Sequence, residues 1–377
     1  MQILTEQYAQ EALSSAYRGF FGIRKKSKEK VAKVLTPQSL CDAYTAGRRT
    51  AKGTYYLKDP TYDLQFELLN LEADKDERHW GIHSFNWEQN IVENLELNLR
   101  SLKENEFLRI SKMALPLSNS YPKDKIERIL YENRLPPPDS FERDEIIRAI
   151  VEVQVLALVV IANHISTIEQ LAVDPISTAT QDYKRHPQVQ RTSAKLTDDE
   201  SKHGLTSGKY LTDVLHAELT PSTKHIKEFD RYHYLAKGMP GGAVFLAYII
   251  EIVGNVFFKR LSSQCPEPLL KEICFKISTK DEDVHIEKCR TLYNFVHQEE
   301  KQTRLGKKWE EYRNAVALVL ITHGVYEEHQ DKSNPFYLAT TALGISREDL
   351  LSDVRIELKT NLDKIGVQIS EKLLSSI

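Results

Sequence analysis

The sequence predicts an all-α protein, and three observations support this fold class. Nearly every long segment has apolar residues at helical spacing, whereas the alternating pattern of a half-buried strand is scarce. The 377 residues include only 15 Gly and 14 Pro, which argues against low-complexity sequence. Prolines also mark the breaks between helical segments, most clearly in LPPPDS at 135–140. We therefore expect helices packed around one another.

The helices expected along the chain become longer and more apolar after residue 140. Asp139 or Ser140 can cap a long helix that should end at Asp174-Pro175. Thr197 or Asp198 is the expected N-cap of a later helix that opens with LTDDE. The expected helices are 4–18, 37–46, 86–104, 123–131, 141–173, 196–217, 222–237, 243–261, 268–297, 308–327 and 346–373. These elements divide the chain into a helical N-terminal extension (1–138), a core bundle (139–300) and C-terminal helices (301–377).

Composition and charge exclude several classes of function. The chain has 51 Lys and Arg against 54 Asp and Glu, so no binding of nucleic acid through bulk positive charge is expected. Its four cysteines form no CxxC pair and the N-terminus has no secretion signal, which predicts a cytoplasmic protein. The apolar run 243–258 is short for a membrane span and contains Glu251, so we expect a core helix and no membrane.

The most informative feature is a repeated pentapeptide. One copy is DESKH at 199–203 and the other is DEDVH at 281–285. Each is D-E-x-x-H within an expected helix, where residues i and i+3 share a face and can reach one metal ion. A single ExxH is expected about once by chance in such a chain, whereas two copies that each follow an Asp are not. Glu200 with His203, and Glu282 with His285, are therefore candidate metal ligands.

Two isolated glutamates stand in the same relation to these motifs. Glu169 precedes Glu200 by 31 residues, and Glu251 precedes Glu282 by 31 residues. Both lie in strongly apolar helices, where a buried carboxylate needs a partner, a proton or a metal. One Glu from each of two helices and a Glu-x-x-His from each of two others is the ligand set of a di-iron or di-manganese carboxylate site in a four-helix bundle.

On these motifs the segment 145–300 resembles the ferritin-like diiron-carboxylate superfamily, whose members include the ribonucleotide reductase small subunit, soluble methane monooxygenase, acyl-carrier-protein desaturases and arylamine N-oxygenases. The resemblance implies a ferritin-like four-helix dimetal bundle over 139–300 with additional N- and C-terminal helices. The implied metal ligands are Glu169, Glu200, His203, Glu251, Glu282 and His285. In several relatives the Asp before each motif Glu accepts a hydrogen bond from the opposite histidine, which implies that Asp281 orients His203 and Asp199 orients His285.

The resemblance also implies a function. It predicts a non-haem diiron oxygenase or oxidase in which the four glutamates and two iron ions activate O₂ to oxidise a small organic substrate. Manganese or a mixed Fe/Mn pair would fit the same ligands. The chain has no flavin or nicotinamide fingerprint, so an external reductase or ferredoxin is the expected electron donor. A homodimer is compatible with this reading. The alternative is a ferroxidase or metal-handling protein without an organic substrate.

Some alternatives remain open at the level of sequence. Glu152 lies in the same apolar helix as Glu169 and competes with it as a ligand, although its separation from Glu200 breaks the 31-residue symmetry. Tyr248 could contact substrate or simply pack in the core. Ser278 stands where arylamine N-oxygenases have a third histidine, and Ser207 where the reductase subunit has its radical-bearing tyrosine. No subgroup is therefore assigned.

Overall fold

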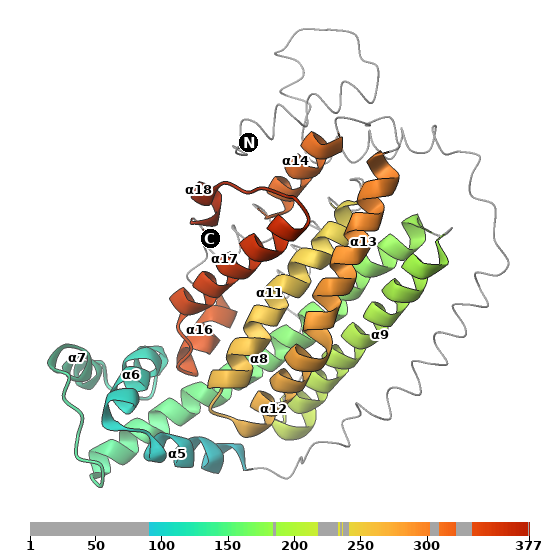
Figure 1. Cartoon of the computed structure of the whole chain (residues 1–377). Helices are drawn as coiled ribbons and strands as arrows, with labels where there is room; N and C mark the ends of the chain where they lie inside the picture. Colours follow the sequence, from blue (N-terminus) through green and yellow to red (C-terminus); the bar gives the residue numbers. More distant parts are fainter. Residues whose placement is uncertain are drawn as a thin grey trace, which may run out of the picture.

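The computed structural model describes residues 90–183, 186–217, 233, 236, 241–301, 309–321, 334–375 and 377. Every regular element among these residues is a helix, which confirms the predicted all-α class for this part of the chain (Figure 1). The helices expected at 4–18, 37–46 and most of 222–237 lie outside the described residues.

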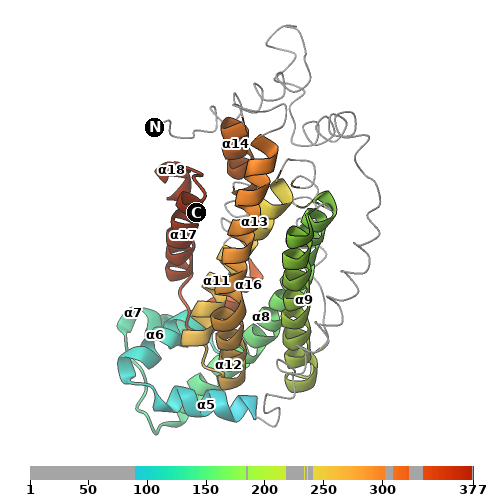
Figure 2. The ribbon, with the colours of Figure 1, turned by 45° about the vertical axis from the view of Figure 1, so that its right-hand side comes forward.

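Four long helical segments lie side by side and form a helical bundle (Figures 1 and 2). They are α8 (Phe141–Asp182), α9 (Pro187–Lys209), α11 (Gly242–Gln264) and a fourth segment composed of α12 (Pro268–Ile277), the π-helical turn η4 (Ser278–Glu282) and α13 (Asp283–Lys301). Helix α8 packs along α9, α11 packs against both α8 and the fourth segment, and the fourth segment also contacts α9. The bundle interior is therefore enclosed by these four segments.

Helix α8 begins where the sequence predicts but ends later. The hydroxyl of Ser140 accepts a hydrogen bond from Arg143 N, as expected of an N-cap after three prolines. The helix does not stop at Asp174-Pro175 but continues through Pro175 to Asp182. Proline removes one backbone hydrogen bond, yet Ile176 and Ala179 are buried and anchor the last turns in the core. Tertiary packing overrides the local stop signal.

Helix α9 begins nine residues earlier than the sequence predicts, at Pro187 instead of 196. Pro187 occupies the first turn, where the missing N–H costs nothing. Thr197 lies inside the helix and its hydroxyl donates to Ser193 O, so neither Thr197 nor Asp198 is an N-cap. The added turns bury Val189, Gln190 and Ser193.

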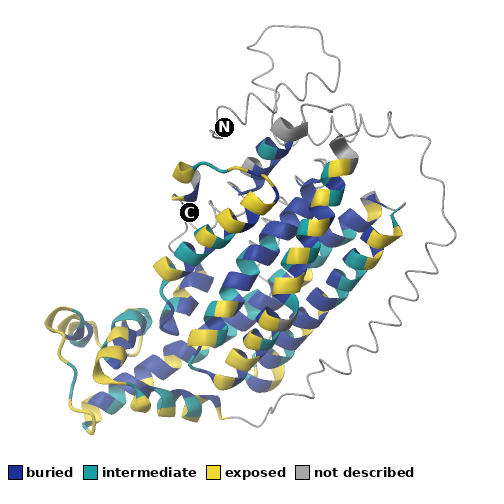
Figure 3. Cartoon of the chain, viewed as in Figure 1, coloured by how far each residue is buried: buried dark blue, intermediate teal, exposed yellow. Residues whose placement is uncertain are grey.

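Helix α11 is the one described helix that is long and apolar enough to cross a membrane. However, 72% of its most apolar window is buried within the structure, as in the core helix of a soluble protein. Figure 3 shows this burial along α11 and α8, in contrast to the largely exposed outer faces of α5–α7.

Shorter helices cover the bundle. The first three, α5 (Ile91–Ser101), α6 (Glu104–Ala114) and α7 (Lys123–Glu132), lie near the start of α8 (Figure 1). Helix α16 (Pro335–Ala342) packs on α8, while α14 (Trp309–Ile321) and α17 (Arg347–Lys364) pack on α11; α18 (Glu371–Leu374) follows. Helices α6 and α16 are not among the expected helices.

Candidate metal centre

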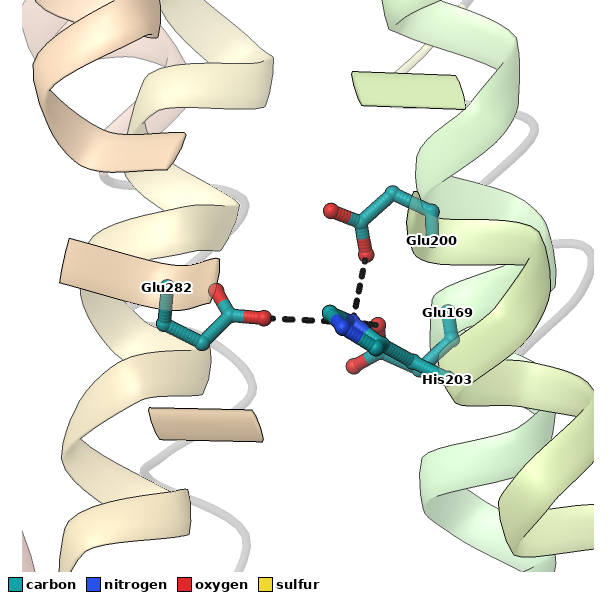
Figure 4. A group of neighbouring side chains, drawn as sticks. All are labelled: Glu169, Glu200, His203 and Glu282. Carbon is teal, nitrogen blue, oxygen red and sulfur yellow. Dashed lines mark hydrogen bonds and ion pairs between the residues drawn. The ribbon is translucent and has the colours of Figure 1, made fainter. Parts of the chain in front are cut away.

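The four glutamates and two histidines predicted as ligands lie together inside the bundle. Their ligand atoms form two groups, within each of which the atoms lie within 4.8 Å of one another. The first group is Glu169, Glu200, His203 and Glu282, and the second is Glu200, Glu251, Glu282 and His285. Figure 4 shows the first group, with His203 between the glutamates of α8 and α9 and Glu282 of the opposite segment.

Helical spacing presents the motif residues on common faces. Glu200 and His203 are three residues apart on α9 and therefore point in the same direction. Glu282 ends the π-helical turn η4, and His285 follows at the start of α13. Single π-helical turns are frequent at functional sites because the extra residue shifts the side chains that follow. The D-E-x-x-H pattern gives no indication of this turn.

A close approach between α8 and α9 brings Glu169 next to the first motif. Ser166 Oγ donates a 2.9 Å hydrogen bond to Gly204 O. A Cβ atom at Gly204 would lie 3.2 Å from Gln170 Cγ and 3.4 Å from Ser166 O, so a larger residue would push the helices apart. Gly204 thus serves close packing of the two helices.

The ring of His203 directs one nitrogen at three carboxylates. Its Nδ1 lies 3.3 Å from Glu169 Oε2, 3.3 Å from Glu282 Oε1 and 3.7 Å from Glu200 Oε2. These distances describe side chains gathered around a common centre.

His285 has an equivalent environment. Its Nδ1 lies 2.9 Å from Glu200 Oε1, 3.4 Å from Glu251 Oε2 and 3.9 Å from Glu282 Oε1. The two imidazole rings are stacked, with their centroids 5.7 Å apart. The cluster therefore consists of two adjacent positions, each with one imidazole and one glutamate of its own.

Glu200 and Glu282 belong to both positions. Oε2 of Glu200 is directed toward His203, while Oε1 of the same carboxylate is directed toward His285. A carboxylate that turns one oxygen to each position can bridge two metal ions. Oε1 of Glu282 lies near both imidazoles, so this carboxylate also stands between the positions.

Each histidine uses its other ring nitrogen to contact the aspartate of the opposite motif. Nε2 of His203 lies 3.1 Å from Asp281 Oδ2, and Nε2 of His285 lies 3.2 Å from Asp199 Oδ2. Carboxylates that accept from the second nitrogen orient ligating imidazoles in metal sites. Asp199 is also 2.9 Å from Lys195 Nζ. Among the described residues, no lysine or arginine forms an ion pair with Asp281.

The cluster is almost completely buried, and its charges are strongly coupled. None of its six ligand candidates is more than 6% exposed. Burial, together with the negative charge of Glu200, raises the pKa of Glu169 and of Glu251 well above the usual range. Burial opposes the charged form of His203, but its hydrogen bond with Asp281 and contacts with the glutamates outweigh burial and raise its pKa. Without metal, protons must reduce the negative charge of the cluster.

Asp199, the aspartate that contacts His285, also has a shifted pKa. Burial acts to raise the pKa of Asp199, but hydrogen bonds with His285 and Lys195 outweigh it and lower this pKa to about 2. Asp199 is therefore an ionised acceptor for the His285 ring.

The donor set fits two divalent cations. Four buried atoms of the cluster make no well-directed hydrogen bond within the described part of the chain, although two of them, Glu200 Oε1 and His285 Nδ1, lie 2.9 Å apart: Glu200 Oε1, Glu251 Oε1, Glu282 Oε1 and His285 Nδ1. Buried polar atoms without partners are rare and call for an explanation, which metal coordination provides. Four ionised glutamates would balance the charge of two divalent ions, and oxygen donors with one imidazole for each ion suit iron or manganese.

The structure places the competing candidates away from the cluster. Glu152 is exposed and stands 17 residues before Glu169, about 25 Å along α8. Tyr248 is buried, and its hydroxyl donates to Asn361 O at 2.9 Å, which ties α11 to α17. Lys195 beside Asp199 is a contact that the motif analysis missed.

Comparison of the chain with models of protein families, with curated proteins and with solved structures finds no match. Function is therefore inferred from the geometry of the cluster.

Proposed function

We propose that the protein is a non-haem dimetal oxidoreductase that activates O₂ to oxidise a small organic substrate. The observation that carries this proposal is the pair of overlapping Glu₃His groups that share Glu200 and Glu282. We further propose that α8, α9, α11 and the fourth segment form a ferritin-like core. Two iron ions are the preferred occupants, with manganese or a mixed pair as substitutes.

The chain's own residues would hold such a pair in defined ways. Glu169 with His203, and Glu251 with His285, would each bind one ion at its own position. Glu200 and Glu282 would bridge the two ions. Asp281 and Asp199 would hold the two imidazoles with Nδ1 toward the metals. The chemistry that a reduced pair supplies is the reduction of O₂ coupled to oxidation of a substrate.

Burial of the cluster supports redox chemistry on a substrate that is shielded from solvent. Excluding water protects reactive species and strengthens the electrostatic interactions inside the site. Hydroxylation, N-oxygenation, desaturation and C–C cleavage are all compatible with this arrangement. Electrons would come from a reductase or ferredoxin, or from the substrate itself.

Oxygen uptake tests this proposal. Protein loaded anaerobically with ferrous iron should consume O₂ beyond the amount that oxidises its own iron when a chemical reductant and a suitable small amine, alcohol or hydrocarbon are added. O₂ uptake that remains proportional to the added iron, whichever substrate is present, would favour the ferroxidase alternative. Loaded protein that consumes no O₂ would contradict both, and Glu251→Ala is the control that should lack uptake.

A further inference from the structure

The bundle interior is polar on one side of the metal cluster. One helical turn beyond the ligands, toward the α11–α12 connection, α9 presents Ser207 (four residues after His203), α11 presents Asn255 (four after Glu251), and the fourth segment presents Ser278 (four before Glu282). In an α-helix, residues four apart share a face and stand about 6 Å apart along the helix axis, which places Ser207 one turn from His203 and Asn255 one turn from Glu251. Ser278 and Glu282 are the first and last residues of the π-helical turn η4. All three are buried. We call Ser207, Asn255 and Ser278 the polar layer.

Two contacts across the bundle set the register between α9 and the fourth segment near this layer. Asp199 of α9 faces His285, and His203 faces Asp281, so a step of four along α9 corresponds to a step of four back along the opposite segment. Further along α9, Tyr210 Oη donates a 2.8 Å hydrogen bond to Glu267 Oε2 at the start of α12, so Ser207 lies between the levels of Asp281 and Glu267 on the fourth segment. Asn255 contacts the same segment through Asp283. The three residues therefore surround a common region of the interior.

Two atoms of the polar layer lack hydrogen-bond partners within the described residues. The Ser207 side chain is fully buried, and its Oγ makes no hydrogen bond. Many serines and threonines of the bundle helices donate to a carbonyl three or four residues back, as Ser177 does to Asp174 O and Ser201 to Thr197 O. The Ser207 hydroxyl makes no such hydrogen bond to a backbone carbonyl, so it is available to a ligand.

The second such atom is Asn255 Oδ1. Asn255 Nδ2 donates a 2.8 Å hydrogen bond to Asp283 Oδ1, and this fixes the orientation of the amide, because a flipped amide would set oxygen against oxygen. Asp283 is exposed, whereas Asn255 Oδ1 is buried and has no partner. The carbonyl edge of the amide therefore faces away from Asp283 as a fixed hydrogen-bond acceptor.

The opposite side of the cluster carries less polar side chains than the polar layer. One turn beyond the ligands in that direction stand Leu196, Ala247 and Cys289, all buried. One turn from the ligands, the described residues therefore offer side-chain oxygen atoms as hydrogen-bond partners on the side of the polar layer, whereas on the other side the unpartnered Ser193 Oγ lies two turns from Glu200.

We propose that Ser207 and Asn255 form a substrate subsite that binds an O–H or N–H donor group, so that the substrate is a small alcohol or amine whose polar end sits in the polar layer and whose carbon chain lies toward the metals. This inference rests on the proposed function. Asn255 Oδ1 accepts the donor's hydrogen, and Ser207 Oγ completes the contact.

The test compares isomeric probes. 1-Propanol can donate a hydrogen bond, while ethyl methyl ether has the same composition but can only accept one; n-propylamine represents the amine arm. The protein is loaded with Co²⁺, and paramagnetic relaxation of the probe's NMR signals by bound cobalt reports affinity and proximity. We expect 1-propanol or n-propylamine to bind at least about tenfold more tightly than the ether, since a site built to bond a donor rejects an analogue that lacks it.

Variants of the polar layer test whether its residues cause the tighter binding of the donor probes. Asn255→Leu and Ser207→Ala should each reduce the preference to less than about threefold. Ser193→Ala is the matched control, because Ser193 is also a buried α9 serine whose Oγ has no partner in the described structure. It lies 14 residues before Ser207, about 21 Å along the helix, and its variant should keep the preference. If Asn255→Leu fails to fold, Ser207→Ala alone decides, since it removes a single atom.

The outcomes separate this inference from the proposed function. Two bound Co²⁺ with equal affinity for all three probes, or a preference that survives in the folded variants, would overturn the subsite and leave the metal centre standing. If no Co²⁺ binds, the proposed function fails, and saturation-transfer NMR of the same probes on the metal-free protein then decides the subsite by the same criterion.

Discussion

Nε2 of His203 lies 3.1 Å from the Oδ2 atom of Asp281, a residue 78 positions further along the chain. The reciprocal contact joins His285 and Asp199. Each D-E-x-x-H motif thus supplies the carboxylate that orients the histidine of the other motif. Because Nε2–H donates to the aspartate, the Nδ1 lone pair of a neutral ring faces the glutamates, as metal ligation requires.

Loss of either aspartate should weaken metal binding without unfolding the protein. Asp281→Asn and Asp199→Asn should each lower metal affinity by about 10–100-fold, because the imidazole loses its charged acceptor. Competition with a chelator measures this affinity. Asp198→Asn is the matched control, since Asp198 pairs with Lys202 and Lys195 and forms no ion pair with a histidine among the described residues. An affinity unchanged in Asp281→Asn would contradict the orienting role.

Removal of Glu251 should abolish binding at one of the two positions. In Glu251→Ala the second metal should be lost, while the melting temperature of metal-free protein should stay the same or rise, because a carboxylate that is costly to bury has been deleted. Thermal melts of wild type and variant, each with and without ferrous iron, measure both effects. If iron stabilises the variant as much as the wild type, Glu251 is not a ligand.

The close approach of α8 and α9 at Gly204 leads to a separate prediction about stability. Gly204→Val should destabilise the protein by about 1–3 kcal/mol, because the side chain would collide with Ser166 and Gln170. Gly254→Ala is the control on α11: its Cβ would meet only Phe258, at 4.0 Å, so the variant should be more stable by about 0.5–1 kcal/mol. Urea unfolding measures both changes. A Gly204→Val variant as stable as wild type would show that the helices do not approach this closely.

The sequence predicts the helical class and the clustering of the ligand candidates better than it predicts helix ends. The described segments with helical periodicity are helices in the structure. Each isolated glutamate also lies in one group with the motif glutamate 31 residues later, Glu169 with Glu200 and Glu251 with Glu282. The predicted helix end at Asp174-Pro175 is wrong, because burial of Ile176 and Ala179 outweighs the local effect of proline and α8 continues to Asp182. The start of α9 at Pro187 could have been read from the preference of proline for the first helical turn.

Other features depend on contacts between distant segments and have no local signature. The π-helical turn before His285 is one of these. The unpartnered Asn255 Oδ1 is another, since it depends on the hydrogen bond to Asp283 across two helices. Lys195 reaches Asp199 by i,i+4 spacing, but it lies outside the D-E-x-x-H motif.

Anaerobic titration with ferrous iron, followed by metal analysis of the desalted protein, tests the dimetal centre most directly. The account predicts about two equivalents of iron per chain in wild type, in line with two-metal carboxylate bundles, and about one in Glu251→Ala. Binding of no iron, or of a single ion that Glu251→Ala leaves in place, would contradict it.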